Sequence, residues 1–427
     1  MPTRTQRTAD AAPAAVRTRQ NCRSCGAPLT QTFADLGCSP LANSYLTEAQ
    51  LEKAEPFYPL RVLVCDRCFL VQLPPVATPE EIFSDYAYFS SYSDSWLRHA
   101  RDYAERMIDR FGFDSTSNVV EIASNDGYLL QYFKERGVSV LGIEPARNVA
   151  AAAEEAGIPT RVEFFGRETA QMLRSAGHEA DLLVGNNVLA HVPDLTGFVA
   201  GLWTLLKPEG IVTMEFPHLL RLIERTEFDT IYHEHLFYFS LLAVARPFEE
   251  AGLTLFDVEE LPTHGGSLRI YARHTDDGSK PMSASVASLR EEEREAGLDR
   301  LDTYKWFDER VRQVKRDLLE FLIDAKRAGK SIVGYGAAAK GNTLLNYCGI
   351  RGDLLDYVVD RSPHKQGRFL PGTRLAIRDP EEVAKTRPDY LLLLAWNLAD
   401  EIIEQMSHVR TFGCRFVVPI PEPNVLE

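Results

Sequence analysis

The feature that most constrains the fold of this chain is an alternation of short apolar runs with helical segments between residues 117 and 275. The runs are rich in Val, Ile and Leu, and they cover residues 119–122, 138–143, 181–184 and 211–215. Strands that alternate with helices are typical of a parallel sheet with helices on both faces. A later run, 268–272, follows two glycines and predicts an antiparallel strand at the edge of the same sheet.

The region after this sheet contains a long helix and then a second α/β pattern. Residues 282–328 are charged, and apolar side chains recur there at helical spacing, namely Trp306, Phe307, Val311, Val314, Leu318 and Leu322. This pattern predicts a helix with one buried stripe, which ends at Gly329. Another strand-and-helix pattern starts at Ser331.

We therefore predict an α/β protein with two Rossmann-like domains. The expected parts are a flexible tail at 1–20, a cysteine-rich module at 21–80, a first α/β domain at 81–280, a helical connector at 281–329 and a second Rossmann-like domain at 330–427. A length of 427 residues supports this division, because one hydrophobic core rarely serves so long a chain.

Charge and composition exclude several classes of protein. The net charge of -14 argues against nucleic acid as a partner, because a phosphate backbone attracts basic faces. No apolar run is long enough to cross a bilayer, and the Arg-containing first 20 residues lack the apolar core of a signal peptide. We therefore expect a cytoplasmic protein that binds neither nucleic acid nor membrane. The oligomeric state stays open, and a monomer is compatible with the sequence.

Four of the seven cysteines form two Cys-x-x-Cys knuckles, Cys22 with Cys25 and Cys65 with Cys68. Two such pairs supply the four thiolates of a tetrahedral zinc site. A shell of four thiolates leaves no position for water, so the predicted zinc is structural. The alternative is a set of cysteines without metal, but a redox pair normally stands alone beside a βαβ pattern.

A nucleoside site is predicted where the strand 119–122 ends. Small and polar residues follow at 123–127, and a helix opens after them. Glu144 ends the next strand, where a carboxylate can accept hydrogen bonds from both ribose hydroxyls. This order resembles the class I S-adenosylmethionine methyltransferases, although Ala and Asn replace two glycines of that family's loop; a bare structural turn is the alternative. The residues predicted to bind the cofactor are Glu121, Ser124, Asn125, Gly127, Glu144 and Asn187.

The second Rossmann-like domain carries a dinucleotide fingerprint. Gly334-x-Gly336-x-x-Ala339 follows the strand that starts at Ser331 and opens a helix, and Asp360 ends the next strand. A nicotinamide-dependent oxidoreductase is therefore the alternative to a methyltransferase. A Rossmann fold whose glycines serve only packing is a further alternative.

The segment 231–240 concentrates acid-base and aromatic side chains, among them Tyr232, Glu234 and His235. A metal site built from His233 and His235 is one alternative to a catalytic role. Residues two apart share a face on a strand but sit poorly together on a helix, and no third ligand is evident nearby. Histidines in core or surface positions are the other alternative.

Six motifs together resemble one family. They are the two cysteine knuckles and the segments 124–127, 232–235, 264–269 and 334–341. The family is the three-domain nucleotide-sugar C-methyltransferases of deoxysugar biosynthesis, and the likeness runs from about 20 to 420. It is strongest toward members that methylate C3 in the pathway to the branched aminosugar tetronitrose.

The resemblance implies an S-adenosylmethionine-dependent enzyme with structural zinc that methylates C3 of a dTDP-linked 4-keto-deoxy(amino)sugar through an enolate. Sugar O-methylation, or oxidation of a nucleotide sugar, remains the alternative. His235 is the expected base, Tyr232 or Tyr86 could take or relay the proton, Glu234 would orient an imidazole, and His191 would donate to the oxyanion. The residues expected to bind substrate are Tyr88, His264, Arg269, Gly336, Lys340 and Asp360.

Overall fold

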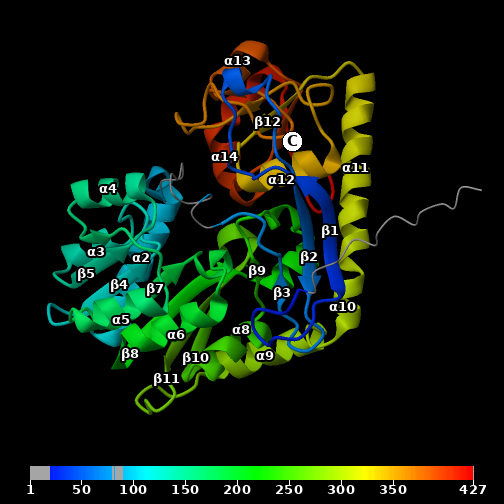
Figure 1. Cartoon of the computed structure of the whole chain (residues 1–427). Coiled ribbons are helices and arrows are strands. Elements are labelled where there is room, and N and C mark those ends of the chain that lie inside the picture. Colours follow the sequence, from blue (N-terminus) through cyan, green and yellow to red (C-terminus); the bar gives the residue numbers. More distant parts are fainter. Residues whose placement is uncertain (1–19, 79–80, 82–89, 427) are drawn as a thin grey trace, which may run out of the picture.

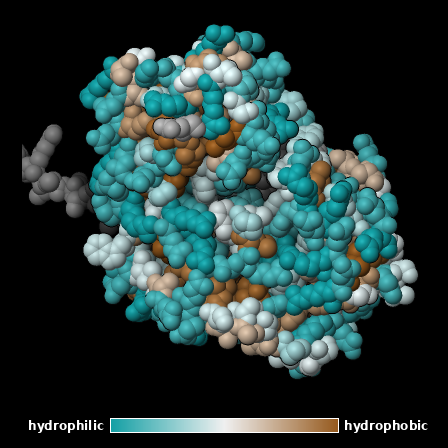
Figure 2. Space-filling view, turned by 180° about the vertical axis from the view of Figure 1, so that it is seen from behind, coloured by the Kyte–Doolittle hydropathy of each residue, from teal (hydrophilic) through white to brown (hydrophobic). Residues whose placement is uncertain are grey.

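A computed structural model describes residues 20–78, 81 and 90–426, and the strands of this part form three sheets (Figure 1). Apart from Gln20, the tail expected at 1–20 lies outside the described residues, and so do Tyr86 and Tyr88. Hydrophilic residues cover most of the face in Figure 2, where hydrophobic ones gather in small groups. None of the described helices combines the length and the apolar character that crossing a bilayer requires.

The N-terminal sheet is antiparallel and is completed by a strand from much later in the chain. Its order is β1 (Gln31–Ser39), β2 (Tyr58–Val64), β3 (Val71–Gln72) and β9 (Phe237–Tyr238). β3 pairs with β9 through Val71 opposite Tyr238 and Gln72 opposite Phe237. The cysteine-rich module and the segment 231–240 therefore meet in one sheet.

The central sheet has seven strands, and its parallel part is the one that the apolar runs predict. The order is β10 (Leu253–Leu261), β11 (Ser267–His274), β8 (Leu206–Pro217), β7 (Ala180–Asn186), β4 (Asn118–Ile122), β5 (Ser139–Ile143) and β6 (Thr160–Arg161). The edge position predicted for β11 is wrong. This strand pairs antiparallel with β8 on one side and with β10 on the other, so β10 forms the edge.

Helices cover both faces of the central sheet. They are α2 (Asp94–Phe111), α3 (Leu130–Glu135), α4 (Arg147–Glu155), α5 (Arg167–Ser175), α6 (Leu195–Leu205), α8 (Leu241–Glu250) and α9 (Ala284–Glu295). Val119 and Leu182 pack with α2 and α3, whereas their neighbours Val120 and Leu183 pack with α5, α6 and α8. Successive strand residues point to opposite faces, so each strand contributes to two cores.

The C-terminal sheet has six strands, all parallel to their neighbours except the last. Its order is β14 (Ile377–Arg378), β13 (Val358–Val359), β12 (Ile332–Tyr335), β15 (Tyr390–Leu393), β16 (Arg415–Val418) and β17 (Asn424–Leu426). Its helices are α12 (Ala339–Cys348), α13 (Glu382–Thr386) and α14 (Ala399–Gln405). The predicted fold class, a zinc-binding module followed by two Rossmann-like units, is confirmed.

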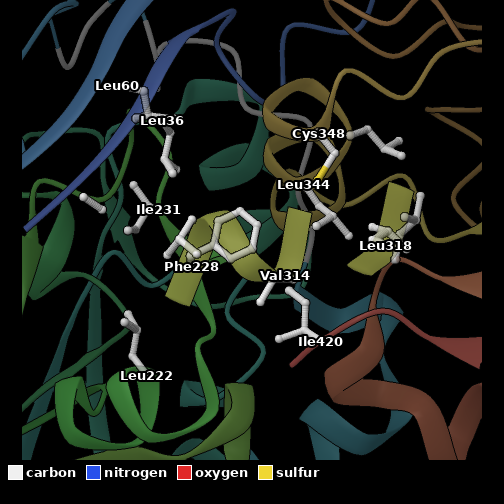
Figure 3. Packing of buried hydrophobic residues seen from close by; sticks show 14 of the residues in the cluster. Leu36, Leu60, Leu222, Phe228, Ile231, Val314, Leu318, Leu344, Cys348 and Ile420 are labelled. Atoms are coloured by element: carbon white, nitrogen blue, oxygen red, sulfur yellow. The ribbon is translucent and has the colours of Figure 1, made fainter. Parts of the chain in front are cut away.

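One hydrophobic core joins the N-terminal sheet, the connecting helices and the C-terminal domain. Leu36, Phe228 and Leu344 meet in it (Figure 3). The connecting helices are α7 (Leu219–Arg225), α10 (Leu301–Lys305) and α11 (Phe307–Arg327). The predicted stripe of α11 is buried from Phe307 onward, but Trp306 is 72% exposed, because it lies at the junction between α10 and α11.

Candidate active site

The carboxyl ends of β4, β5 and β7 bring the predicted cofactor residues together. The three strands are adjacent and parallel, and Glu144 and Asn187 directly follow β5 and β7. The loop after β4 turns sharply, since Ala123, Asn125 and Gly127 have φ angles of 57°, 50° and 79°. Such turns let a ligand approach the backbone closely.

The carboxylate of Glu144 ties two of these loops together. Its Oε2 accepts a hydrogen bond from the N–H of Asn125 at 3.0 Å, and its Oε1 accepts one from the N–H of Ala146 at 2.8 Å. Burial raises the pKa of Glu144, and these two backbone bonds oppose the rise. Glu144 therefore holds the loop after β4 against β5, at the position where nucleoside-binding folds present an acid to the ribose.

Several buried acceptor atoms around these loops have no hydrogen-bond partner within the described part of the chain. They are Oγ of Ser124, Oδ1 of Asp126 and Oδ1 of Asn187. Burial, together with the nearby carboxylates of Asp126 and Glu144, raises the pKa of Glu121 well above its usual value. Each unsatisfied buried acceptor costs about 1–3 kcal/mol, which a donating ligand would offset. S-adenosylmethionine carries an ammonium, a sulfonium and two ribose hydroxyls, so these residues fit it.

His235 lies between two hydrogen-bond partners from its own segment. Its Nδ1 is 2.9 Å from the backbone oxygen of Thr230, and its Nε2 is 2.7 Å from the hydroxyl of Tyr232. Only a protonated Nδ1 can donate to the carbonyl, so the neutral ring accepts a hydrogen bond from Tyr232 at Nε2. Burial lowers the pKa of His235 well below its usual range, and the neighbouring His191 adds to this effect.

His191 faces the same imidazole from the loop after β7. It ends the short helix η3 (Leu189–His191), and its ring centroid lies 4.9 Å from that of His235. Burial lowers the pKa of His191 to about 4. The N–H of Leu236 donates to the carbonyl of Ala190 at 2.7 Å, which fastens the two histidine segments to each other. A small cavity beside them is lined by Ala190, Phe216, Pro217, Thr230, His235, Phe237, Tyr238 and Phe239.

Glu234 and His233 contact the N-terminal module. Oε1 of Glu234 accepts a hydrogen bond from the side-chain amide of Asn43 at 2.7 Å. The ring of His233 is buried and meets that of Tyr58 edge-on, with 5.9 Å between centroids. The cysteine-rich module thus packs directly against the predicted catalytic segment.

The C-terminal domain contacts the same segment from the other side. Nε1 of Trp396 donates to Oδ2 of Asp229 at 2.7 Å, and the hydroxyl of Thr343 donates to the carbonyl of Ile231 at 3.0 Å. Nζ of Lys340 lies 4.7 Å from the centroid of the Trp396 ring. Sequence reasoning missed Asp229, Thr343 and Trp396, because polar pairs so far apart in the chain leave no local pattern.

Buried charges gather at this junction. Burial lowers the pKa of Lys340, and the carboxylates of Asp229 and Glu227 oppose the change. Burial also raises the pKa of Glu227 to about 8. The pKa of His264 falls to about 4 through burial and the charge of Lys340. Two of the predicted substrate residues, His264 and Lys340, are therefore close enough to interact.

Arg269, another predicted substrate residue, belongs to a buried ion-pair network. Its guanidinium lies 2.8 Å from Oε2 of Glu215 and 3.3 Å from Oε2 of Glu259, and it stacks over the ring of Tyr103. Nε2 of His99 lies 3.0 Å from the same Glu215 oxygen. Although burial raises the pKa of Glu215, the bond with His99 and the charge of Arg269 bring it to about 2. Arg269 has no exposed side-chain surface in this network.

The turn of the dinucleotide fingerprint is filled by protein atoms. Oδ2 of Asp360 accepts from the N–H of Ala337 at 2.8 Å. The carbonyl of Ala337 accepts from the hydroxyl of Tyr45 at 2.6 Å and from Nζ of Lys365 at 3.0 Å. Gly336 has a φ of 98°, and a Cβ there would come within 2.9 Å of the loop after β15. Glycine at 336 thus permits close packing, and Asp360 satisfies backbone groups.

The four cysteines of the two knuckles form one cluster. Their Sγ atoms all lie within 4.8 Å of one another. Sγ of Cys22 is 3.5 Å from that of Cys68, and Sγ of Cys25 is 3.4 Å from that of Cys65. Four thiolates about 2.3 Å from a tetrahedral zinc ion would stand about 3.8 Å apart, so the cluster fits zinc after small adjustments.

The central fold and the acceptor-rich edge of its sheet are those of an S-adenosylmethionine-dependent methyltransferase. Family models match a zinc binding domain at 22–83, a methyltransferase domain at 96–258 and a C-methyltransferase C-terminal domain at 262–421. The chain is 37% identical over 411 residues to the C-methyltransferase NovU of Streptomyces niveus, a match that covers 96% of this chain and 98% of that protein. The chain therefore belongs to the C-methyltransferase family, as the sequence motifs predict, and uses S-adenosylmethionine and a structural zinc.

Other likenesses cover only part of the chain. A ubiquinone biosynthesis O-methyltransferase of Methylobacterium sp. (strain 4-46) is 32% identical over 97 residues, which span 22% of this chain and 38% of that protein. Among solved structures, magnesium protoporphyrin IX methyltransferase of Synechocystis PCC 6803 aligns with a TM-score of 0.32 and 12% identity, over 41% of this chain and 78% of that one. A TM-score this low supports no conclusion about function.

We expect Cys65→Ser to abolish stoichiometric zinc binding and to lower the melting temperature. A structural zinc site contributes on the order of 10–16 kcal/mol of apparent binding free energy, and three thiolates hold the ion less well than four. Metal content by mass spectrometry and thermal unfolding check this. Cys38→Ser is the matched control, since Cys38 is exposed and lies outside the cluster. Full stability of metal-free wild-type protein would contradict a structural role for zinc.

We expect Glu144→Gln to weaken S-adenosylmethionine binding by about 10- to 100-fold, because hydrogen bonds to a charged acceptor contribute about 1.5–3 kcal/mol. Calorimetric titration with S-adenosylmethionine checks this. Glu155→Gln, which changes an exposed carboxylate at the end of α4, should leave the affinity unaltered. An unchanged affinity in Glu144→Gln would move the ribose site elsewhere.

Proposed function

We propose that this protein transfers the methyl group of S-adenosylmethionine to C3 of a dTDP-linked 4-keto-deoxy(amino)sugar in the cytoplasm, and that the reaction passes through an enolate. Membership of the C-methyltransferase family supports carbon as the acceptor atom. The observation that carries the proposal is the hydrogen-bonded pair of His235 and Tyr232 beside His191. A site of four thiolates also suits a reducing compartment.

Carbon methylation needs a base, because a C–H bond beside a ketone must lose its proton before the carbon can attack. The Nδ1 bond of His235 to the Thr230 carbonyl keeps the lone pair on Nε2, where it can accept the hydroxyl proton of Tyr232. The resulting phenolate, or His235 itself, removes the C3 proton of the sugar. Tyr86, which lies outside the described residues, stays a second candidate for this role.

The enolate places negative charge on the C4 oxygen, and a hydrogen-bond donor must stabilise it. We assign this role to His191, whose imidazole lies edge-on to His235. The bound cofactor supplies an electrophilic methyl group, so the C3–CH3 bond forms as the S–CH3 bond breaks and S-adenosylhomocysteine leaves. Glu234, through its bond to the Asn43 amide, keeps the backbone that precedes His235 in place.

We propose that the nucleotide part of the substrate lies between the central sheet and the C-terminal domain. The charge of Lys340 acts on His264 there, and Lys340 is the cation we assign to the diphosphate. Tyr88, which the structure does not describe, and Gly336 remain further candidates for contacts with the substrate. The buried pairing of Arg269 with Glu215 favours a positioning role for Arg269 over a direct contact.

The contacts of the fingerprint turn disfavour a nicotinamide cofactor. Asp360 would have to release the N–H groups of Ala337 and Ser362 in order to bind a ribose. Tyr45 and Lys365 donate hydrogen bonds to the carbonyl of Ala337 in the same turn. A nucleotide can still approach this domain near Lys340 at the start of α12, where the N–H groups of a first helical turn favour an anion.

We expect wild-type enzyme with S-adenosylhomocysteine to exchange the C3 proton of a dTDP-4-keto sugar for deuterium in deuterated water. His235→Gln and Tyr232→Phe should each slow this exchange and the methyl transfer by about 10²- to 10⁴-fold, which is what general acid-base groups contribute. Proton NMR follows the exchange, and carbon NMR of the product locates the methyl group. His408→Gln, at an exposed histidine, is the control. A product methyl bonded to oxygen would overturn the proposal, and exchange undiminished in both variants would remove the base assignment.

We expect methyl transfer to persist at pH values well below the usual pKa of histidine. The lowered pKa of His235 keeps the imidazole neutral and able to accept a proton there, so the rate falls only as the pH drops through this lowered value. The folded protein itself loses stability below about pH 6.5, because unfolding frees imidazoles such as His191 and His264, with pKa about 4, to protonate. Rates are therefore compared only where circular dichroism shows folded enzyme. An acidic limb centred near pH 6.5 in folded enzyme would contradict the prediction.

A further inference from the structure

We propose that Arg23, which lies between the two cysteines of the first knuckle, is a positioning residue that sets the geometry of His235 relative to His191. The inference rests on the proposed function, which makes these two imidazoles the base and the oxyanion donor. A zinc ion held by four thiolates has no open position and cannot act on the substrate itself. Through Arg23, the zinc-binding module would still contribute to the reaction.

The guanidinium of Arg23 reaches from the knuckle to the residue that follows His235. Its Nη2 donates to the carbonyl of Leu236 at 2.9 Å and to the carbonyl of Leu73 at 2.7 Å. The same group lies over the ring of Phe237, 4.1 Å from its centroid. One side chain therefore binds β3 and the start of β9 at the point where the catalytic segment enters the N-terminal sheet.

The backbone of Leu236 is held through both its N–H and its carbonyl. Its carbonyl accepts from Arg23 and from the N–H of Leu73 at 2.9 Å, and its N–H donates to the carbonyl of Ala190 at 2.7 Å. Ala190 directly precedes His191, and Leu236 directly follows His235. The backbone of Leu236 therefore links the segment of His235 to that of His191 and helps to determine how the two imidazoles approach each other.

The position of Arg23 is in turn coupled to the metal site. The backbone N–H of Arg23 donates to Oε1 of Gln72 at 3.1 Å, and Nε2 of Gln72 lies 3.2 Å from Sγ of Cys22. Zinc bound to Cys22 and Cys25 would fix the backbone on both sides of Arg23. The hydrogen bonds of the Gln72 side chain then fasten the first knuckle to β3.

The chemistry of this position requires arginine. A planar guanidinium can donate to two carbonyls while it stacks on an aromatic ring, whereas an ammonium is a compact, strongly hydrated group. An arginine guanidinium is charged at neutral pH. Its hydrogen bonds are therefore charge-assisted and about twice as strong as neutral ones.

The test compares Arg23→Ala, Arg23→Lys and Arg67→Ala. Arg67 is the matched control, because it lies between the cysteines of the second knuckle but is exposed. We expect both Arg23 variants to lower kcat by about 10- to 100-fold, with KM for the sugar nucleotide and Kd for S-adenosylmethionine changed less than threefold, since small misplacements of reacting groups cost rate more than binding. Free guanidinium should restore part of kcat in Arg23→Ala only. Zinc content and melting temperature show whether each variant keeps its module.

A second readout needs no substrate. Nitrogen NMR of histidine-labelled protein, with His235→Gln and His191→Gln for assignment, reports the tautomers of the two rings. We expect both Arg23 variants to move or broaden the His235 signals, and Arg67→Ala to leave them unchanged. Unaltered His235 signals in zinc-loaded Arg23→Lys would overturn the proposal, and so would an unaltered kcat, whatever Arg23→Ala does. If the wild type methylates no sugar nucleotide, the proposed function fails, and the NMR comparison still decides the role of Arg23.

Discussion

The pairing of β3 with β9 is the constraint on which the rest of this structure depends. It places Gln72, from the cysteine-rich module, opposite Phe237, two residues after His235. The C-terminal domain holds the same segment from its other end, through Thr343 and the carbonyl of Ile231. The central domain contributes the third contact, between Ala190 and Leu236. Three units of the chain therefore meet at this segment, and removing any of them would displace its histidines.

Desolvation determines the chemistry available to these histidines. Burial is the first cause of the lowered pKa of His191, His235 and His264, and the charge of Lys340 adds to it at the last two. Imidazoles that stay neutral can accept a proton from a neighbour or donate a hydrogen bond, depending on the tautomer. Bonds donated to fixed backbone carbonyls, such as that from His235 to Thr230, then select the tautomer. The burial that packs these histidines is thus also the cause of their neutral state.

The sequence predicted those parts of the structure that depend on residues close together in the chain. The cysteine knuckles, the alternating strands and the acid after β5 have fixed spacings, and the structure and the family comparison confirm the fold and the cofactors they indicate. Relations between distant residues were not predictable, such as the Asn43 bond to Glu234 or the place of β11 inside the sheet. The fingerprint at 334–339 shows why. Glycines that admit a ligand and glycines that admit a neighbouring loop form the same pattern, and only the tertiary position of Tyr45 shows what occupies the turn.

The late origin of β9 also affects how the chain is made. The cysteines and β1 to β3 are complete at residue 72, but the strand that covers the free edge of β3 ends at residue 238. At about 5–20 residues per second, a ribosome needs on the order of ten seconds or more to synthesise the chain between them. During that interval the edge of β3 is open to strands of other nascent chains. Until β9 is synthesised, this edge of β3 lacks the partner strand that covers it in the folded molecule through Phe237 and Tyr238.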